Sequence, residues 1–259
     1  MHHESIGFIG GGRITRVFLG GWTKAHTVPA TVVVSDTDPS VLALLKQHYE
    51  CVDAVLGDNA TAAAQDVVFI ALHPPLIADA LAQVKSSLRP QALVVSLAPK
   101  LTMAKLADLL GGFNRLARAI PNAPSLVGAG FNPVAFSSAL NDGDRDTIRR
   151  LLHPLGTCCE TVEEKLESYA LLTAMGPTYF WPLLYELIAL GESFGLSRAE
   201  AESGIKHMLA GTVDTMLESR LDAGEVQDLI PVKPLADVEQ VILDAYRTTL
   251  KAVFEKIKP

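Results

Sequence analysis

The chain has 259 residues, of which 49% are hydrophobic and 20% are charged, a composition that is typical of globular proteins and excludes a disordered one. The formal net charge of −7 and the absence of a basic cluster argue against a nucleic-acid partner, because phosphate binding depends on grouped Lys and Arg. A chain of this length holds one large domain or two smaller ones, and we expect two.

Export and membrane insertion are not expected from the sequence. Residues 1–4 lack the basic stretch and the apolar run of a secretory signal. The longest uncharged apolar stretch, residues 170–185, is interrupted by a glycine and two prolines and is shorter than the roughly 20 residues that span a bilayer. We therefore expect a cytoplasmic protein with no membrane partner. The three cysteines and scattered histidines show no metal-binding spacing, so we predict reduced thiols and no structural metal.

Short β-branched apolar runs alternate with helical patterns in the first part of the chain. The runs lie at residues 5–10, 31–35, 66–71, 92–97 and 115–120, and the helical patterns lie at 12–23, 39–48, 75–86 and 102–110. This alternation predicts a parallel sheet with helices between its strands. A further strand is expected at 125–130, after a Pro-Asn-Ala-Pro corner.

Helical patterns dominate the second part of the chain. From about Asp142 the strand signals fade, apart from residues 156–161, and helices are expected from Val162 onward, including 197–220 and 234–258. We predict an α/β Rossmann-type dinucleotide-binding domain at 1–155, followed by an all-α substrate and dimerisation domain at 156–259.

A glycine-rich loop follows the first predicted strand and opens the first predicted helix. In such a loop the first glycine makes the tight turn, the second lets the backbone approach a pyrophosphate, and the third allows close helix packing. Gly10 and Gly12 fit the first two positions, whereas Thr15 stands at the third. The sequence therefore predicts dinucleotide binding, and the alternative is a glycine-rich turn with no ligand.

Asp36 ends the second predicted strand, where an acid accepts hydrogen bonds from the adenosine ribose hydroxyls. Together with Asp38 it would repel a 2′-phosphate, so NAD(H) is favoured over NADP(H). The alternative is that residues 36–39 cap the following helix.

Three segments of the first half carry a family resemblance. Residues 6–13 read I-G-F-I-G-G-G-R, residues 71–75 read A-L-H-P-P, and residues 118–124 read R-A-I-P-N-A-P. They resemble I-G-F-I-G-A-G-N, A-V-K-P-Q and R-x-M-P-N-T-P of the pyrroline-5-carboxylate reductase family. That family reduces a cyclic imine with a nicotinamide cofactor in the last step of proline synthesis.

The helical half extends the resemblance. Gly176-Pro177-Thr178-Tyr179 is similar to the end of the family's S-G-S-G-P-A-Y, and residues 195–201 resemble its G-L-P-R-E-x-A. The resemblance implies a Rossmann domain with a helical domain that interlocks two subunits. A homodimer or larger assembly that binds a small-molecule substrate is therefore expected.

Three departures from the family pattern concern the substrate. Residues 173–175 read Thr-Ala-Met where the family has Ser-Gly-Ser, and His73 replaces a lysine. The family's T-S-P-G-G-T-T loop, which helps to hold the substrate carboxylate, is absent after Asp228, where residues 229–235 read L-I-P-V-K-P-L. These changes leave the substrate open.

The patterns and the resemblance together define three sets of candidate residues. The predicted cofactor contacts are Gly10, Gly12, Arg13, Ile14, Asp36, His73, Pro74 and Asn122. The predicted substrate contacts are Asn122, Gly176, Pro177, Thr178, Tyr179 and Lys233. The candidate catalytic residues are Thr173, Thr178 and His73, of which His73 could supply a proton near neutral pH.

Each candidate has a plainer interpretation. Asn122 could serve a tight corner through its side chain, His73 could be an ordinary loop histidine, and Lys233 could be solvated. The kink at Gly176-Pro177 could improve packing alone. The aromatic and leucine cluster at 179–188 is interpreted as core or dimer interface rather than a pocket.

Three acidic residues also have a structural interpretation. Glu163, Glu164 and Glu167 lie near a helix start, where acids favour the macrodipole, so a paired-carboxylate site is not predicted.

The sequence thus predicts an NAD(P)H-dependent reductase of the C=N bond of a small cyclic imino acid. One alternative is a related oxidoreductase acting on another imine or carbonyl. A β-hydroxyacid dehydrogenase is a weaker rival, because residues 172–179 lack the lysine expected there. A non-catalytic, nucleotide-binding regulatory dimer is the alternative from another class.

Overall fold

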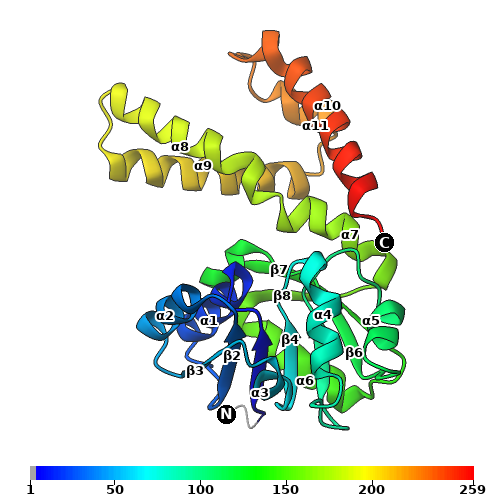
Figure 1. Cartoon of the computed structure of the whole chain (residues 1–259). Coiled ribbons are helices and arrows are strands. Elements are labelled where there is room, and N and C mark those ends of the chain that lie inside the picture. Colours follow the sequence, from blue (N-terminus) through cyan, green and yellow to red (C-terminus); the bar gives the residue numbers. More distant parts are fainter. Residues whose placement is uncertain (1–3) are drawn as a thin grey trace. The chain divides into compact units, whose positions relative to one another are not determined.

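A computed structural model describes residues 4–259 of the chain, with Pro74 and Pro75 described by their backbone alone. Within this range one eight-stranded sheet has the order β3-β2-β1-β4-β5-β6-β7-β8, and β7 runs antiparallel to β6 (Figure 1). The strands are β1 (Ile6–Ile9), β2 (Val32–Asp36), β3 (Val52–Leu56), β4 (Val67–Ile70), β5 (Leu93–Ser96), β6 (Leu116–Ala119), β7 (Gly130–Phe136) and β8 (Gly156–Glu160). The predicted parallel Rossmann-type sheet is confirmed.

Helices cover both faces of the sheet, because alternate strand residues face opposite sides. One face packs against α1 (Arg13–Lys24), α2 (Pro39–His48) and α6 (Asp142–Leu152), and its core includes the stacked rings of Phe8 and Phe69. The other face packs against α3 (Asn59–Ala63), α4 (Pro74–Val84) and α5 (Met103–Leu109). The carboxyl ends of the parallel strands therefore form one open edge.

The predicted strand at 125–130 is wrong. A 3₁₀ turn, η1 (Ala123–Val127), occupies the first half of that range and ends at Gly128, whose φ is 70°. The strand instead begins at Gly130 and includes Asn132-Pro133, a pair that is typical of turns. The Oδ1 of buried Asn132 accepts a hydrogen bond from the Ser125 hydroxyl at 2.7 Å, whereas its Nδ2 is buried without a hydrogen-bond partner in the described part of the chain. The sequence patterns also missed β3, α3 and α6.

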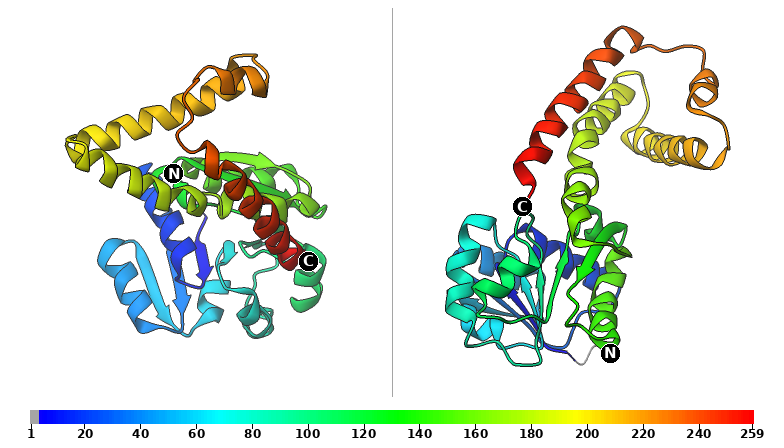
Figure 2. Two further views of the ribbon diagram at one scale, coloured as in Figure 1. Left: turned by 90° about the horizontal axis from the view of Figure 1, so that it is seen from above. Right: turned by 90° about the vertical axis from the view of Figure 1, so that its right-hand side faces the viewer.

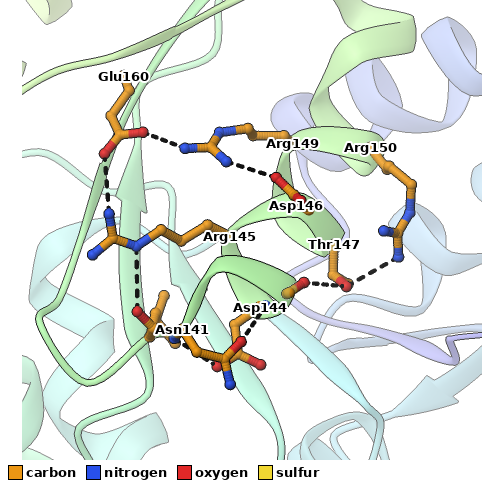
Figure 3. Close-up of polar contacts among 10 residues, drawn as sticks. Asn141, Asp144, Arg145, Asp146, Thr147, Arg149, Arg150 and Glu160 are labelled. Atoms are coloured by element: carbon orange, nitrogen blue, oxygen red, sulfur yellow. Dashed lines mark hydrogen bonds and ion pairs between the residues drawn. The ribbon is translucent and has the colours of Figure 1, made fainter.

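Strand β8 belongs to the sheet and is tied to α6 by an ion-pair cluster (Figure 3). Arg149 pairs with both Asp146 and Glu160, and Arg145 Nη1 lies 3.5 Å from Glu160 Oε1. Both guanidinium groups also lie over the ring of Phe136, at 5.7 and 5.3 Å from its centroid. Such partly exposed pairs contribute little singly, but together they fix α6 on the last strands.

The chain after β8 begins with short helical turns. These are η3 (Glu163–Lys165), α7 (Leu166–Tyr169) and a π-helical turn, η4 (Ala170–Ala174). The Met175 N–H donates to the Ala170 carbonyl at 2.9 Å, five residues back. Single π turns commonly occur at functional sites.

Two compact units divide the chain. The first comprises residues 1–175 and 254–259, and the second comprises Gly176–Val253. This division differs from the predicted boundary after residue 155, because β8 and the turns that follow it pack with the sheet. Where independently folding domains begin and end stays a prediction.

The second unit is helical, as predicted. It contains α8 (Pro177–Ser193), α9 (Arg198–Glu218), α10 (Ala223–Asp228) and most of α11 (Ala236–Ile257). Helices α8 and α9 run back along each other (Figure 2), and they approach closely where a Cβ on Gly191 would lie 3.1 Å from the Ala201 Cβ. None of the helices in the described range is long and apolar enough to cross a membrane.

Candidate functional site

The glycine loop leaves β1 at the open edge of the sheet and has the geometry that a dinucleotide needs. Gly10 has a φ of 104°, and a Cβ there would lie 2.6 Å from the Ala71 carbonyl oxygen, so this position requires glycine. Gly12 has ordinary φ and ψ angles of −70° and −158°, and a Cβ there would meet nothing within 4 Å. Gly10 thus shapes the turn, while Gly12 leaves open space beside the backbone.

Thr15 shows how the loop tolerates a departure at its third position. The side chain is fully buried, and its hydroxyl donates a 2.6 Å hydrogen bond to the Gly10 carbonyl. The hydroxyl therefore ties the first turn of α1 back to the loop, and the departure is compatible with the expected turn.

Asp36 and Asp38 have different roles. Asp36 Oδ2 accepts a hydrogen bond from the Gly11 N–H at 2.7 Å, and its Oδ1 accepts one from the Asp38 N–H at 2.9 Å. Asp38 caps α2 by accepting from the Ser40 N–H at 2.8 Å. Hydrogen bonds from the Ser40 hydroxyl and N–H hold the pKa of Asp38 below its usual range. The capping interpretation thus fits Asp38, whereas Asp36 faces the glycine loop.

A cavity of about 920 Å³ lies along the carboxyl edge of the sheet. It is lined by Gly10, Gly12, Arg13, Ile14, Ser35, Asp36, Thr37, Gly57, Asn59, Ala71, Leu72, His73, Leu76, Asp79, Ala80, Gln83, Leu97, Ala98, Pro99, Pro121, Ala174 and Met175. Strands β1 and β4 are neighbours in the sheet, but the chain continues from β1 to β2 on one side and from β4 to β5 on the other. A reversal of this kind is where open α/β sheets bind ligands.

Six of the predicted cofactor residues line this cavity: Gly10, Gly12, Arg13, Ile14, Asp36 and His73. His73 is exposed at the N-terminus of α4, where its side chain does not cap the helix. The side chain of Pro74 falls outside what the structure describes. The binding roles of all these residues stay predictions.

The side chain of Asn122 makes hydrogen bonds within the protein. Its side chain is only 7% exposed, Oδ1 accepts from the Phe131 N–H, and Nδ2 donates to the Thr173 carbonyl, both at 3.1 Å. The hydroxyl of Thr173 donates to the Tyr169 carbonyl within its own turn at 2.8 Å. Neither residue is among those lining the cavity. Both side chains therefore make hydrogen bonds within the protein, and their binding and catalytic roles stay predictions.

The remaining candidates lie in the second unit. Gly176, Pro177, Thr178 and Tyr179 begin α8, and the Tyr179 ring contacts Tyr246 edge-on at 5.8 Å between centroids. Lys233 is exposed before α11. Their roles toward the substrate stay predictions, because they belong to a different unit from the cavity.

Sequence reasoning missed several lining residues. Asn59, at the start of α3, is oriented by the Ser35 hydroxyl, which donates to its Oδ1 at 2.8 Å. Asp79 and Gln83 come from one side of α4, and Met175 follows the π turn. Asn59 was missed because the preceding strand β3 was missed. Asp79 and Gln83 carry no motif and reach the cavity through packing alone, whereas Met175 stands where the family has the last Ser of Ser-Gly-Ser but was not assigned a binding role.

The residues present fit a dinucleotide. The first turn of α1 contains no acidic residue and has no side-chain cap, so its N–H groups remain available for a pyrophosphate. Arg13 adds a guanidinium at the same turn, and the open space at Gly12 permits close approach. A metal is not suggested, since no group of three or more His, Cys, Asp or Glu side chains in residues 4–259 could hold one.

The fold and this cavity define a Rossmann-type NAD(P)-binding protein. Residues 5–100 match a family model described as NADP oxidoreductase, coenzyme F420-dependent. The pyrroline-5-carboxylate reductase of Escherichia coli K12 is 25% identical over 228 residues, which cover 88% of this chain and 84% of that protein.

Solved structures show the same relationship. The pyrroline-5-carboxylate reductase of Coxiella burnetii superimposes with a TM-score of 0.69 at 26% identity, covering 98% of this chain and 94% of that one. A Plasmodium falciparum pyrroline carboxylate reductase, solved with NADP bound, gives a TM-score of 0.81 at 20% identity, covering 99% and 96%. The resemblance to the pyrroline-5-carboxylate reductase family that the sequence motifs indicate is therefore confirmed over most of the chain.

Proposed function

We propose that this protein is an NAD(P)H-dependent reductase that transfers hydride to the C=N bond of a small cyclic imino acid. The observation that carries the proposal is the cavity at the β1–β4 edge, which combines a dinucleotide loop with an apolar far end. Support also comes from relatives of this activity whose similarity extends over most of both chains.

The protein's contribution to such a reaction is mainly positioning. A bound nicotinamide supplies the hydride, which adds to the imine carbon, while the imine nitrogen takes up a proton. Gly12, Arg13 and the first turn of α1 would hold the pyrophosphate, and Asp36 would hold the adenosine ribose. His73 is exposed and lines the cavity, and it would deliver or relay the proton.

The far end of the cavity favours a second candidate, a related reductase acting on a different imine or carbonyl. Ala174 and Met175 line the wall where the family has Gly and Ser. The apolar residues Leu97, Ala98 and Pro121 line the same cavity. An apolar wall disfavours a polar substituent, because a buried polar group without a partner is costly.

We also propose a homodimer or larger assembly. Helices α9 and α11 of the second unit expose large apolar side chains, including Met216, Leu217 and Val241. Single exposed apolar residues are common, but several on neighbouring turns are typical of an interface. Light scattering at several protein concentrations tests this, and a monomer throughout would contradict it.

Absorbance at the reduced-nicotinamide band tests the activity. Pyrroline-5-carboxylate, its six-membered homologue and a panel of 2-oxo acids are each offered with NADH and with NADPH. Turnover on a cyclic imino acid supports the proposal, and turnover on 2-oxo acids alone supports the second candidate. Cofactor binding without turnover supports a regulatory dimer. Absence of nucleotide binding contradicts all three.

Two variants separately test the cofactor site and the substrate anchor. Gly12→Val places a side chain in open space and leaves the loop unstrained, so the protein should fold but lose nucleotide binding. Lys233→Ala should raise the substrate KM if this lysine replaces the missing carboxylate loop. An unchanged KM and turnover would show that it does not.

A further inference from the structure

Arg118 is a fully buried cation at the centre of β6, and it joins three segments of the first unit. Its Nη1 lies 3.0 Å from Glu163 Oε1, and its Nη2 lies 2.5 Å from Glu167 Oε1. Nη2 also lies 3.5 Å from the Ala98 carbonyl oxygen, after β5. The two acids thus do more than begin a helix, which corrects the interpretation based on the macrodipole.

The same carboxylates hold the loop after β5. Glu167 Oε1 also accepts the Lys100 N–H at 3.1 Å, and Glu163 Oε1 accepts the Met103 N–H at 2.7 Å. Lys100 has a φ of 72°, a left-handed conformation that is uncommon for a residue with a side chain. Such a conformation persists only where the surroundings hold it. Glu167 provides one of the bonds that do so.

Each of the three joined segments supplies part of one end of the cavity. Ala98 and Pro99 come from the loop after β5, Pro121 follows Arg118 at the end of β6, and Ala174 and Met175 follow the segment of Glu163 and Glu167. A dinucleotide bound across the β1–β4 crevice with its adenosine beside β2 would have its nicotinamide toward β5 and β6. The buried arginine would then stand behind the nicotinamide end.

The cluster is not optimised for stability. In the described part of the chain, Arg118 Nε and Glu167 Oε2 are buried without a hydrogen-bond partner. A buried ion pair recovers its desolvation cost only when the remaining polar atoms are also satisfied. Orphaned atoms on the buried Arg118 and Glu167 side chains call for another explanation, and the position of the cluster behind three cavity-lining segments provides one.

We propose that Arg118, through Glu163 and Glu167, is a positioning residue that fixes the nicotinamide end of the cavity without touching the cofactor. This inference rests on the proposed function for the identity of that end. It predicts that loosening the cluster slows hydride transfer while leaving the affinity for the dinucleotide nearly unchanged, because adenosine and pyrophosphate contacts lie elsewhere.

Arg118→Lys tests the proposal, since a single ammonium keeps the charge but cannot reproduce the planar fork between two carboxylates. We expect turnover with NADH to fall by about 10- to 100-fold, with the Kd for NADH changed by about threefold or less. Amide hydrogen exchange at residues 98–103 and 170–175 should rise by about tenfold or more. If Arg118→Lys does not fold, the same measurements are made on Glu167→Gln, which keeps an acceptor oxygen and removes the charge.

Arg115→Met is the matched control. Arg115 precedes β6 and is partly buried, and its Nη2 pairs with Asp144 Oδ1 at 2.7 Å, on α6 and away from the segments that line the cavity. This variant should lose thermal stability and keep both its turnover and its exchange at 98–103. The proposal is overturned if Arg118→Lys and Glu167→Gln behave like Arg115→Met.

Failure of the proposed function is distinguishable from failure of this inference. If the unmodified protein binds NADH but reduces no substrate, the exchange rates at 98–103 and the emission of bound NADH still report on the cluster. Faster exchange and altered emission in Arg118→Lys support positioning even then. Unchanged exchange and emission reject it whatever the substrate proves to be.

Discussion

The Asp36 carboxylate accepts a 2.7 Å hydrogen bond from the Gly11 N–H, so the end of β2 and the glycine loop are joined directly. This bond orients Asp36 at the cavity wall, where it would meet the ribose of a dinucleotide. We predict that the carboxylate that shapes the loop also affects the choice between NADH and NADPH.

Asp36→Asn is expected to shift the cofactor preference toward NADPH. Without the negative charge, the 2′-phosphate of NADPH is no longer repelled, so the ratio of the NADPH KM to the NADH KM should fall by about tenfold, equivalent to about 1.4 kcal/mol. Steady-state kinetics with both cofactors measure the ratio.

Asp38→Asn is the control for this change, because asparagine also caps helices well and the substitution removes a charge two residues away. An equal shift of the ratio in both variants would show that general charge, and not Asp36, sets the preference.

Thr15→Val should destabilise the first unit. Valine has nearly the same shape but cannot donate to the buried Gly10 carbonyl, and losing such a bond costs about 1–2 kcal/mol. Thermal unfolding should show a Tm lower by several degrees, together with weaker dinucleotide binding. Thr15→Ser keeps the hydroxyl and should retain most of the affinity. Equal affinities of the two variants would argue against a role for the hydroxyl in the loop.

Asp66 should make stability depend on pH in the acid range. Burial raises the pKa of its carboxyl, but hydrogen bonds from the Ser5 N–H and hydroxyl and from Arg89 outweigh burial and hold the pKa below its usual value. The folded protein thus binds fewer protons than the unfolded chain. This contribution is present above about pH 4 and is lost as the pH falls through the lowered native pKa.

Asp66→Asn is therefore expected to cost about 1 kcal/mol or less at pH 7, since the pair with Arg89 is half exposed and screened. Urea unfolding between pH 3 and pH 7 measures the free energy of unfolding of the variant and of the unmodified protein. The difference between these two free energies should become smaller below about pH 4. Asp53→Asn, on the exposed side of β3, is the control and should leave the pH profile unchanged. A constant difference at every pH would contradict the role of the Asp66 charge.

Cys158 should resist alkylation in the folded protein. Burial raises the pKa of its thiol to about 11, so roughly one thiol in a thousand is ionised at pH 8. We expect iodoacetamide to label Cys158 about two orders of magnitude more slowly than an ordinary thiol. Mass spectrometry after timed labelling, with urea-unfolded protein as the reference, measures this. Similar rates in both states would show that the thiol is accessible and ionised.

Local sequence determined the Rossmann half and its dinucleotide loop. Strand and helix periodicities are short-range signals, and Gly10, Gly12 and Asp36 are set by backbone geometry within one β-α-β unit. The strand at 125–130 was misplaced for two reasons. Pro124 and Gly128 are turn signals that the chain follows by forming η1, whereas the turn signal of Pro133 is overridden by long-range pairing of β7 with β6 and β8.

Tertiary structure alone decided how the far end of the cavity is built. Arg118 and Glu167 are 49 residues apart in the chain, and no local pattern indicates that they pair. Met175 reaches the wall because a π turn follows α7, and Asn122 uses its amide to bridge Phe131 and Thr173. A buried charge or amide takes whichever partner packing brings within reach, so the sequence determined the residues and the fold determined their partners.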